Sequence, residues 1–275
     1  MKIIADKDIP YIENYFSRDF DLILKSGRHI TKNDVKEADI LLVRSVTTVN
    51  SNLLSGTRVK FVGTVTSGHD HLDTIWLDQA GIAYAAAKGF NAPAVADYVV
   101  SVIAALQKKG IQSNTKMKAA IIGVGDIGHL VERYLKKLNY ETLLCDPLRA
   151  HHETDFVSHS LDDIEDVDLI SLHVPLTRDK NHPTFHFIDK HFLRRQRKDC
   201  VLLNASRGAV IHTDDLLSHG QHLHWCFDVW EHEPYINKAI LKHTLIATPH
   251  IAGYSRQSKL RGIDLIYQLM VKLQN

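Results

Sequence analysis

The sequence has little of what marks secreted, membrane-spanning or fibrous proteins. Three of its 275 residues are cysteine, an odd number placed far apart in apolar runs at Cys145, Cys200 and Cys226. This argues against a disulfide framework and for a reducing compartment, so we expect a cytoplasmic protein. No run approaches the roughly 20 apolar residues of a membrane span. Asp6 and Asp8 stand where a secretory signal would continue its apolar core, so no such signal is expected.

The sequence also has no excess of positive or of negative charge. Lysine and arginine number 33 and aspartate and glutamate 32, which leaves a formal net charge of +1. This balance provides no electrostatic footprint for nucleic acid or an anionic bilayer, so we expect a small-molecule substrate. The sequence also has no internal repeat, no low-complexity segment and no Gly/Ser-rich linker. Its length suits two domains, each large enough to bury its own core.

Short β-rich runs alternate with amphipathic stretches along the whole chain, which predicts α/β domains with parallel sheets. The alternation restarts after a long apolar-striped helix predicted over residues 91–109, so we expect two doubly wound domains. Residues 110–118 are polar and predict an exposed turn. A last helix, predicted over residues 255–273, has no strand after it and could pack on either domain. The predicted strands are residues 2–5, 21–25, 40–43, 61–64, 119–123, 142–145, 168–172, 201–204, 225–229 and 245–248.

A glycine-rich turn follows the strand predicted over residues 119–123. Gly123, Gly125 and Gly128 have the GxGxxG spacing of dinucleotide-binding turns, and Asp126 and Ile127 open the helix that follows. The first glycine allows a tight turn, the second lets the backbone approach a pyrophosphate, and the third lets helix and strand pack closely. The helix N-terminus offers unpaired N–H groups to the anion. These residues predict a dinucleotide site.

The carboxylate of Asp146 ends the next predicted strand, 18 residues after Gly128. At this place it can accept hydrogen bonds from ribose hydroxyls and would repel a 2′-phosphate, which favours NAD over NADP. Arg149, three residues on, could pair with such a phosphate, although a solvated loop arginine is the other interpretation.

Three further segments carry polar residues just beyond predicted strands, at the sheet edge where open α/β sheets bind ligands. His250 is the candidate base that takes a hydroxyl proton while hydride leaves the same carbon. Glu233 is placed to hold that imidazole in one orientation, and Arg207 to bind a carboxylate bidentately. Taken singly, each of the three has an ordinary structural interpretation as a helix-entry, turn or surface residue.

These segments, NASRGAV, DVWEHEP and TPHIAGY, resemble the three catalytic signatures of the D-isomer-specific 2-hydroxy-acid dehydrogenases, in that family's order. The resemblance implies a Rossmann NAD-binding domain over residues 91–253, inserted in a flavodoxin-like substrate domain of residues 1–90 plus 254–275. It also implies that Arg207, Glu233 and His250 are catalytic. By the same resemblance the NAD contacts include Asp146, Ser206, Arg207, Asp228 and Gly253. Val174 stands where a hydroxyl residue is often found near the cofactor.

Longer stretches, among them FVGTVTSGHDHLD and TPHIAGYSRQSKLRG, resemble the branch of that family that oxidises 4-phospho-D-erythronate in vitamin B6 biosynthesis. In that branch the positions of Ser45, Thr66 and Tyr254 touch the substrate. Arg44 is the first candidate for the substrate phosphate and Arg256 the second, and a surface ion pair is an equal alternative for both. Longer members of the branch dimerise through a further C-terminal domain, and a homodimer is expected here.

Other interpretations stay open at this point. His222, His224 and Cys226 alternate along a predicted strand, and the HDH run at residues 69–71 adds two imidazoles, a spacing that can bind zinc but also occurs on any sheet face. We expect no metal. The substrate could instead be 3-phosphoglycerate or a simpler 2-hydroxy acid. A regulatory protein that senses NAD would share the same fold.

Overall fold

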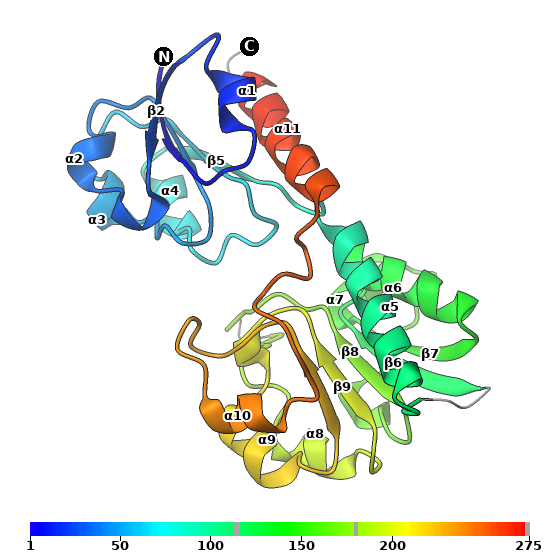
Figure 1. Ribbon diagram of the computed structural model, residues 1–275. Helices are drawn as coiled ribbons and strands as arrows, with labels where there is room; N and C mark the ends of the chain where they lie inside the picture. Colours follow the sequence, from blue (N-terminus) through cyan, green and yellow to red (C-terminus); the bar gives the residue numbers. More distant parts are fainter. Residues whose placement is uncertain (113–115, 179–180, 273–275) are drawn as a thin grey trace. The chain divides into compact units, whose positions relative to one another are not determined.

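The computed structural model describes residues 1–112, 116–178 and 181–272 (Figure 1). The chain divides into two compact units: unit 1 comprises Met1–Asn91 and Tyr254–Asn275, and unit 2 comprises Ala92–Gly253. Each unit is built on a parallel β-sheet with helices on both faces, so the predicted α/β class with two doubly wound domains is confirmed. Among the described residues, no helix combines the length and apolar character that crossing a bilayer requires.

Unit 1 contains a five-stranded sheet in the order β2-β1-β3-β4-β5. This is a flavodoxin-like order, in which the direction of winding reverses between β1 and β3 and ligands bind beyond the carboxyl ends of those strands. The sequence predicted four of the strands and missed β5, because its small alanines carry little of the β-branched signal. The strands are β1 (Lys2–Asp6), β2 (Asp21–Lys25), β3 (Ile40–Val43), β4 (Phe61–Thr64) and β5 (Ala83–Ala86).

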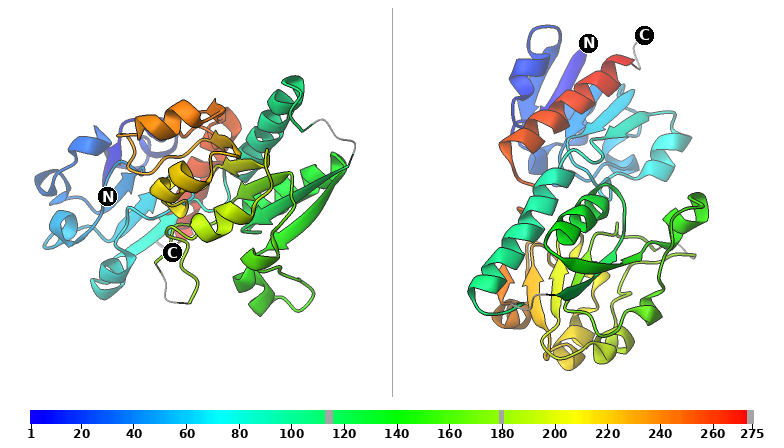
Figure 2. Two further views of the ribbon diagram at one scale, coloured as in Figure 1. Left: turned by 90° about the horizontal axis from the view of Figure 1, so that it is seen from below. Right: turned by 90° about the vertical axis from the view of Figure 1, so that its right-hand side faces the viewer.

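Alternating side chains of these strands enter two separate cores. Ile3 and Ala5 face one core while Ile4 faces the other, as the two-residue period of a strand requires. The first core is closed by α1 (Ile12–Phe16) and α11 (Arg256–Lys272), which lie side by side in Figures 1 and 2. The last predicted helix therefore packs on unit 1. The second core is closed by α2 (Lys32–Val35), α3 (Ser51–Leu54) and α4 (Thr74–Gln79), and a short 3₁₀ turn spans Gly27–His29.

Unit 2 contains a six-stranded parallel sheet in the order β11-β10-β9-β8-β6-β7. Every strand predicted for this part exists, with ends that differ by a few residues. The exposed turn predicted over residues 110–118 is wrong at its end, because Met117 is buried, pairs with Tyr140 and begins β6; residues 113–115 lie outside the described residues. The strands are β6 (Met117–Ile122), β7 (Tyr140–Cys145), β8 (Leu169–Leu172), β9 (Val201–Asn204), β10 (His224–Phe227) and β11 (Ile246–Ala247).

Helices cover both faces of this sheet. One face packs on α5 (Ala92–Lys108) and α6 (Asp126–Lys137), and the other on α8 (Lys190–Arg195), α9 (Thr213–His219) and α10 (Lys238–His243). The central strands β8 and β9 are buried along their whole length for this reason. The remaining short helices are α7 (Pro147–His152) and the 3₁₀ turns Leu161–Asp163 and Gly208–Val210. The cysteine thiols at positions 145, 200 and 226 are buried and unpaired, and burial raises their pKa values to about 11 or 12.

Candidate active site

The glycine turn between β6 and α6 has the geometry that the spacing predicted, and each glycine does something different. Gly123 has a φ of +88°, and a Cβ atom there would lie 2.7 Å from the backbone of His173. A Cβ on Gly128 would lie 2.0 Å from the carbonyl oxygen of Gly123, so helix and turn pack too closely for any side chain. A Cβ on Gly125 would meet no atom within 4 Å. The middle glycine is thus not needed for packing, which is what a residue facing a bound pyrophosphate requires.

The carboxylate of Asp146 holds this turn in place. Its Oδ2 accepts a hydrogen bond from the Val124 amide at 2.8 Å, and its Oδ1 caps α7 by accepting one from the Arg149 amide at 2.9 Å. Asp146 therefore links the end of β7 to the glycine turn, while each of its oxygens keeps a further lone pair for a ligand hydroxyl.

Arg149 is not the solvated loop arginine that one interpretation expected. It is the third residue of α7, and its guanidinium stacks 4.3 Å from the ring centre of Phe156. It donates to Glu153 and to the carbonyl oxygen of Val124. The arginine is held because the chain brings an aromatic ring and two acceptors around it.

The switch point of the unit 2 sheet lies between β6 and β8, directly beside the glycine turn. Val174 follows β8 and is partly buried against the core beneath the turn. Burial lowers the pKa of His173 to about 3, so this imidazole is neutral over the physiological range. Its Nε2 lies 2.8 Å from the hydroxyl of Ser171. A Rossmann sheet binds its dinucleotide at such a switch point.

His250 and Glu233 are hydrogen-bonded, with 2.8 Å between Nδ1 and Oε2. Glu233 also accepts a bond from the Trp230 amide through Oε1 at 2.8 Å. Burial acts to raise the pKa of Glu233, but these two hydrogen bonds and the charges of His250 and Arg207 outweigh it and lower that pKa. An ionised carboxylate only accepts, so Nδ1 carries the proton and the neutral ring has its lone pair on Nε2.

Arg207 lies just beyond β9 in a loop shaped by Asn204. The Asn204 amide oxygen accepts from both the backbone and the hydroxyl of Ser206, and its amide nitrogen donates to the carbonyl of Arg207. Ser206 is buried, and Arg207 is partly exposed. A Cβ on Gly208 would lie 1.9 Å from the Trp230 carbonyl carbon, so the glycine lets this loop contact the loop that carries Glu233.

Asp228 is buried beneath the His250 loop rather than exposed beside it. Its carboxylate accepts hydrogen bonds from the Thr248 hydroxyl at 2.6 Å and from the amides of Ile251 and Ala252 at 2.8 Å. Its carbonyl accepts from the amide of His250, a residue with a φ of +57°. Asp228 thereby sets the path of the chain through His250 to Gly253.

Sequence reasoning missed several residues that support this arrangement. The indole of Trp230 donates to the Thr248 carbonyl at 2.9 Å, which ties the Glu233 loop to the His250 loop. The Thr248 hydroxyl uses its single hydrogen in the bond to Asp228, so it can only accept from a second partner. That partner is the Tyr98 hydroxyl of α5, whose oxygen lies 2.7 Å from the Thr248 oxygen. Burial raises the pKa of Tyr98 to about 12. The polar residue Asn204 at the end of an apolar strand could have indicated a structural role for that position. No sequence pattern around Tyr98 indicated its contact with Thr248.

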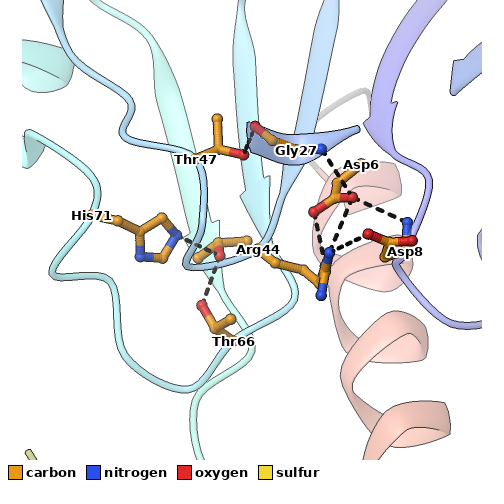
Figure 3. A network of polar contacts seen from close by, with 8 residues as sticks. Asp6, Asp8, Gly27, Arg44, Thr47, Thr66 and His71 are labelled. Atoms are coloured by element: carbon orange, nitrogen blue, oxygen red, sulfur yellow. Dashed lines mark hydrogen bonds and ion pairs between the residues drawn. The ribbon is translucent and has the colours of Figure 1, made fainter. Parts of the chain in front are cut away.

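In unit 1 the candidate phosphate ligand Arg44 is engaged by two carboxylates. Its guanidinium donates to Asp6, which is fully buried, at 2.8 and 3.3 Å and to Asp8 at 2.8 Å (Figure 3). Burial acts to lower the pKa of Arg44, but the two aspartates outweigh it and raise that pKa. Arg44 therefore forms an ion pair, as one of its two interpretations expected, although the partner Asp6 is buried. A phosphate at this arginine would have to compete with both carboxylates.

The other candidate substrate residues of unit 1 differ in exposure. Ser45 and Arg256 are exposed, and Tyr254 is 63% exposed with the Lys259 ammonium 4.2 Å from its ring centre. Thr66 is partly buried, and its hydroxyl lies 2.7 Å from that of Thr64.

The residues considered for zinc are occupied otherwise. His222 contacts the Gln196 carbonyl through Nε2, His224 lies 3.7 Å from Asp199, and Cys226 is buried in β10. Over the described ranges, no group of three or more histidine, cysteine, aspartate or glutamate side chains is arranged to hold a metal ion.

Known proteins place this chain in a family. Residues 95–252 match the model of the D-isomer specific 2-hydroxyacid dehydrogenase NAD-binding domain. Over 272 residues the chain is 47% identical to an erythronate-4-phosphate dehydrogenase of Coxiella burnetii strain RSA 331, covering 99% of this chain and 74% of the relative. The chain belongs to the D-isomer specific 2-hydroxyacid dehydrogenase family. An erythronate-4-phosphate dehydrogenase of Escherichia coli O1:K1 is 41% identical over 276 residues, covering 99% of this chain and 73% of that one.

Solved structures of other dehydrogenases share the fold. An Aquifex aeolicus D-lactate dehydrogenase, complexed with NAD and lactic acid, aligns with a TM-score of 0.80 at 23% identity and covers 99% of this chain and 95% of its own. An NAD⁺-bound 3-phosphoglycerate dehydrogenase of Entamoeba histolytica aligns with a TM-score of 0.82 at 20% identity, covering 100% and 96%. The family's NAD-binding domain falls within unit 2, so the cofactor of this chain is NAD and the glycine turn belongs to that domain.

Proposed function

We propose that this protein is an NAD-dependent dehydrogenase that oxidises 4-phospho-D-erythronate to 2-oxo-3-hydroxy-4-phosphobutanoate, a step of pyridoxal 5′-phosphate biosynthesis. Identity of 41 to 47% over nearly the whole chain with proteins named erythronate-4-phosphate dehydrogenase supports this substrate. The geometry that carries the reaction is the His250–Glu233 hydrogen bond, because it leaves Nε2 of the imidazole able to accept a proton.

The proton chemistry follows from that bond. Nε2 of His250 takes the proton of the C2 hydroxyl, and Glu233 stabilises the imidazolium that forms. The hydrogen bond from the Trp230 amide to Oε1 keeps the carboxylate aimed at Nδ1. NAD, when bound, would supply the acceptor for the hydride of C2.

Arg207 is the proposed ligand of the substrate carboxylate, because a guanidinium fork matches a carboxylate bidentately and polarises the adjacent carbonyl as it develops. Its charge also acts on Glu233, which keeps the carboxylate ionised. Ser45, Thr66 and Tyr254 are the proposed further substrate contacts, with Arg44 or Arg256 for the phosphate.

The NAD contacts are proposed on the glycine turn and on the loops after the strands of unit 2. Unit 2 is the proposed NAD-binding domain and unit 1 the proposed substrate domain, and we propose a cytoplasmic homodimer. The candidate contacts are Gly123, Gly125, Asp126, Ile127, Gly128, Asp146, Val174, Ser206, Arg207, Asp228 and Gly253.

NADH formation tests the proposal. Purified protein and NAD are mixed in separate reactions with 4-phosphoerythronate, 3-phosphoglycerate, glycerate and lactate. We expect kcat/KM to be highest for 4-phosphoerythronate. Preference for another acid contradicts the substrate, and no turnover of any acid by protein that binds NAD contradicts the enzymatic function and favours an NAD sensor.

A further inference from the structure

Three side chains of unit 1 form one continuous hydrogen-bonded chain that ends at Thr66. The hydroxyl of Thr66 lies 2.7 Å from the carbonyl oxygen of Gly68 and 2.7 Å from the hydroxyl of Thr64. The Thr64 hydroxyl lies 2.9 Å from Nε2 of His71. Thr66 and His71 are labelled in Figure 3. Thr64 ends β4 and is fully buried, so its hydroxyl depends on these protein partners.

The Gly68 carbonyl determines the direction of every bond in this chain. A carbonyl has no hydrogen to donate, so the Thr66 hydroxyl must donate to it. A hydroxyl has a single hydrogen, and that of Thr66 is now used. The bond between the two threonines must therefore run from Thr64 to Thr66.

The bond between Thr64 and His71 has a fixed direction for the same reason. Thr64 has also used its one hydrogen, so it can only accept from His71. Nε2 of His71 must carry a proton. The histidine and the two threonines thus form a donor chain of fixed direction that runs toward Thr66.

The Thr66 hydroxyl can only accept a further hydrogen bond. Its oxygen donates to Gly68 and accepts from Thr64, which leaves one lone pair and no hydrogen for a ligand. We infer that Thr66 accepts a hydrogen bond from the substrate hydroxyl that is not oxidised, an inference that rests on the proposed function, in which Thr66 touches the substrate. Thr64 and His71 are then positioning residues that hold the Thr66 hydroxyl in place.

Only one group of the proposed substrate can donate this hydrogen bond to Thr66. The carboxylate of 4-phosphoerythronate only accepts hydrogen bonds, and its phosphate is mostly a dianion above its second pKa of about 6, so neither can donate to Thr66. The C2 hydroxyl gives its proton to His250 during the reaction. The C3 hydroxyl is the remaining donor, so Thr66 makes this site prefer acids with a hydroxyl beside the reacting carbon.

Nitrogen NMR of the ligand-free protein tests the direction of the chain without any assumption about the substrate. The imidazole nitrogens are labelled with ¹⁵N, and the His71 signals are identified by their loss in His71→Gln. We expect a proton on Nε2 at about pH 8, where unperturbed imidazoles are neutral. An unprotonated Nε2 with the proton on Nδ1 overturns the inference.

Kinetics with a matched pair of substrates test the consequence. The two compounds are 4-phosphoerythronate and its 3-deoxy analogue, 2-hydroxy-4-phosphobutanoate. Thr66→Val keeps the shape of the side chain and removes the oxygen, so kcat/KM for the hydroxylated acid should fall about tenfold while that for the analogue stays nearly constant. Thr66→Ser keeps the oxygen and should retain the wild-type preference between the two.

An equal loss for both compounds in Thr66→Val means that the residue is structural or binds a group common to both, and the inference fails. The same ratio measured in Thr64→Val should fall in the same direction but by less, because the Thr66 hydroxyl then keeps only the bond to Gly68 of the two that hold it. Failure of the proposed function is distinguishable: the wild type would then oxidise neither compound. Wild-type turnover with an unchanged ratio in Thr66→Val contradicts this inference alone.

Discussion

His250 and Glu233 share a hydrogen bond of 2.8 Å between Nδ1 and Oε2, although the two residues belong to loops after different strands. The loops are joined by the Trp230 indole, which donates to the Thr248 carbonyl, and by the Trp230 amide, which donates to Glu233. The proton position on His250 therefore depends on the packing of one tryptophan. The pKa of Glu233 is lowered, so its carboxylate accepts from His250 at neutral pH and loses this role only as the pH falls through the lowered value.

Glu233→Gln should reverse that hydrogen bond. The Gln amide group can donate to Nδ1, which moves the proton of neutral His250 to Nε2 and removes the base, so kcat should fall about 10²-fold or more. A pH series of kcat/KM should show no recovery at alkaline pH. Glu231→Gln is the matched control, because Glu231 bonds to His186 and Thr213 instead. Equal losses in both variants would contradict a specific role for Glu233.

His250→Asn should separate chemistry from cofactor binding. His250 has a φ of +57°, a conformation that asparagine adopts more readily than alanine, so the loop should keep its shape. Turnover should fall about 10²-fold or more on loss of the base while the Kd for NAD changes little. Calorimetric titration with NAD and steady-state kinetics measure the two quantities. Nearly intact turnover would remove His250 from the mechanism.

Gly125→Ala should weaken NAD binding, whereas Gly128→Ala should lower the stability of the fold. A Cβ on Gly125 meets no protein atom within 4 Å, so Tm should stay close to wild type while the Kd for NAD rises about tenfold because the methyl enters the pyrophosphate space. A Cβ on Gly128 would lie 2.0 Å from the Gly123 carbonyl oxygen, so Tm itself should fall. Thermal denaturation and NAD titration of both variants check this. Unchanged NAD affinity in Gly125→Ala would place the pyrophosphate elsewhere.

Asp228→Asn should loosen the His250 loop. The buried carboxylate accepts three hydrogen bonds, and an amide nitrogen turned toward Ile251 or Ala252 would meet a donor, so stability should fall by about 1–3 kcal/mol. Turnover should fall as well because His250 is displaced. Urea denaturation and kinetics measure both. Loss of NAD affinity with unchanged stability would instead assign Asp228 to the cofactor alone.

Asp146→Ser should relax the preference for NAD while keeping the helix cap. The serine hydroxyl can still accept from the Arg149 amide, as Asp146 does, but the charge that repels a 2′-phosphate is gone. The ratio of kcat/KM for NAD to that for NADP should fall about tenfold, a change of about 1.4 kcal/mol in discrimination. An unaltered ratio would mean that another group recognises the ribose.

Local sequence patterns were enough to predict the alternation of strands and helices, the glycine turn and the order of the polar segments. Strand period, glycine geometry and strand-end position are all local properties. The tertiary structure alone decided which partners those residues meet. Arg44 meets a buried aspartate from a neighbouring strand, Asp228 turns beneath the His250 loop, and the last helix packs on unit 1. No local pattern contains such information, because each contact joins residues far apart in the sequence and depends on the packing of the sheet between them.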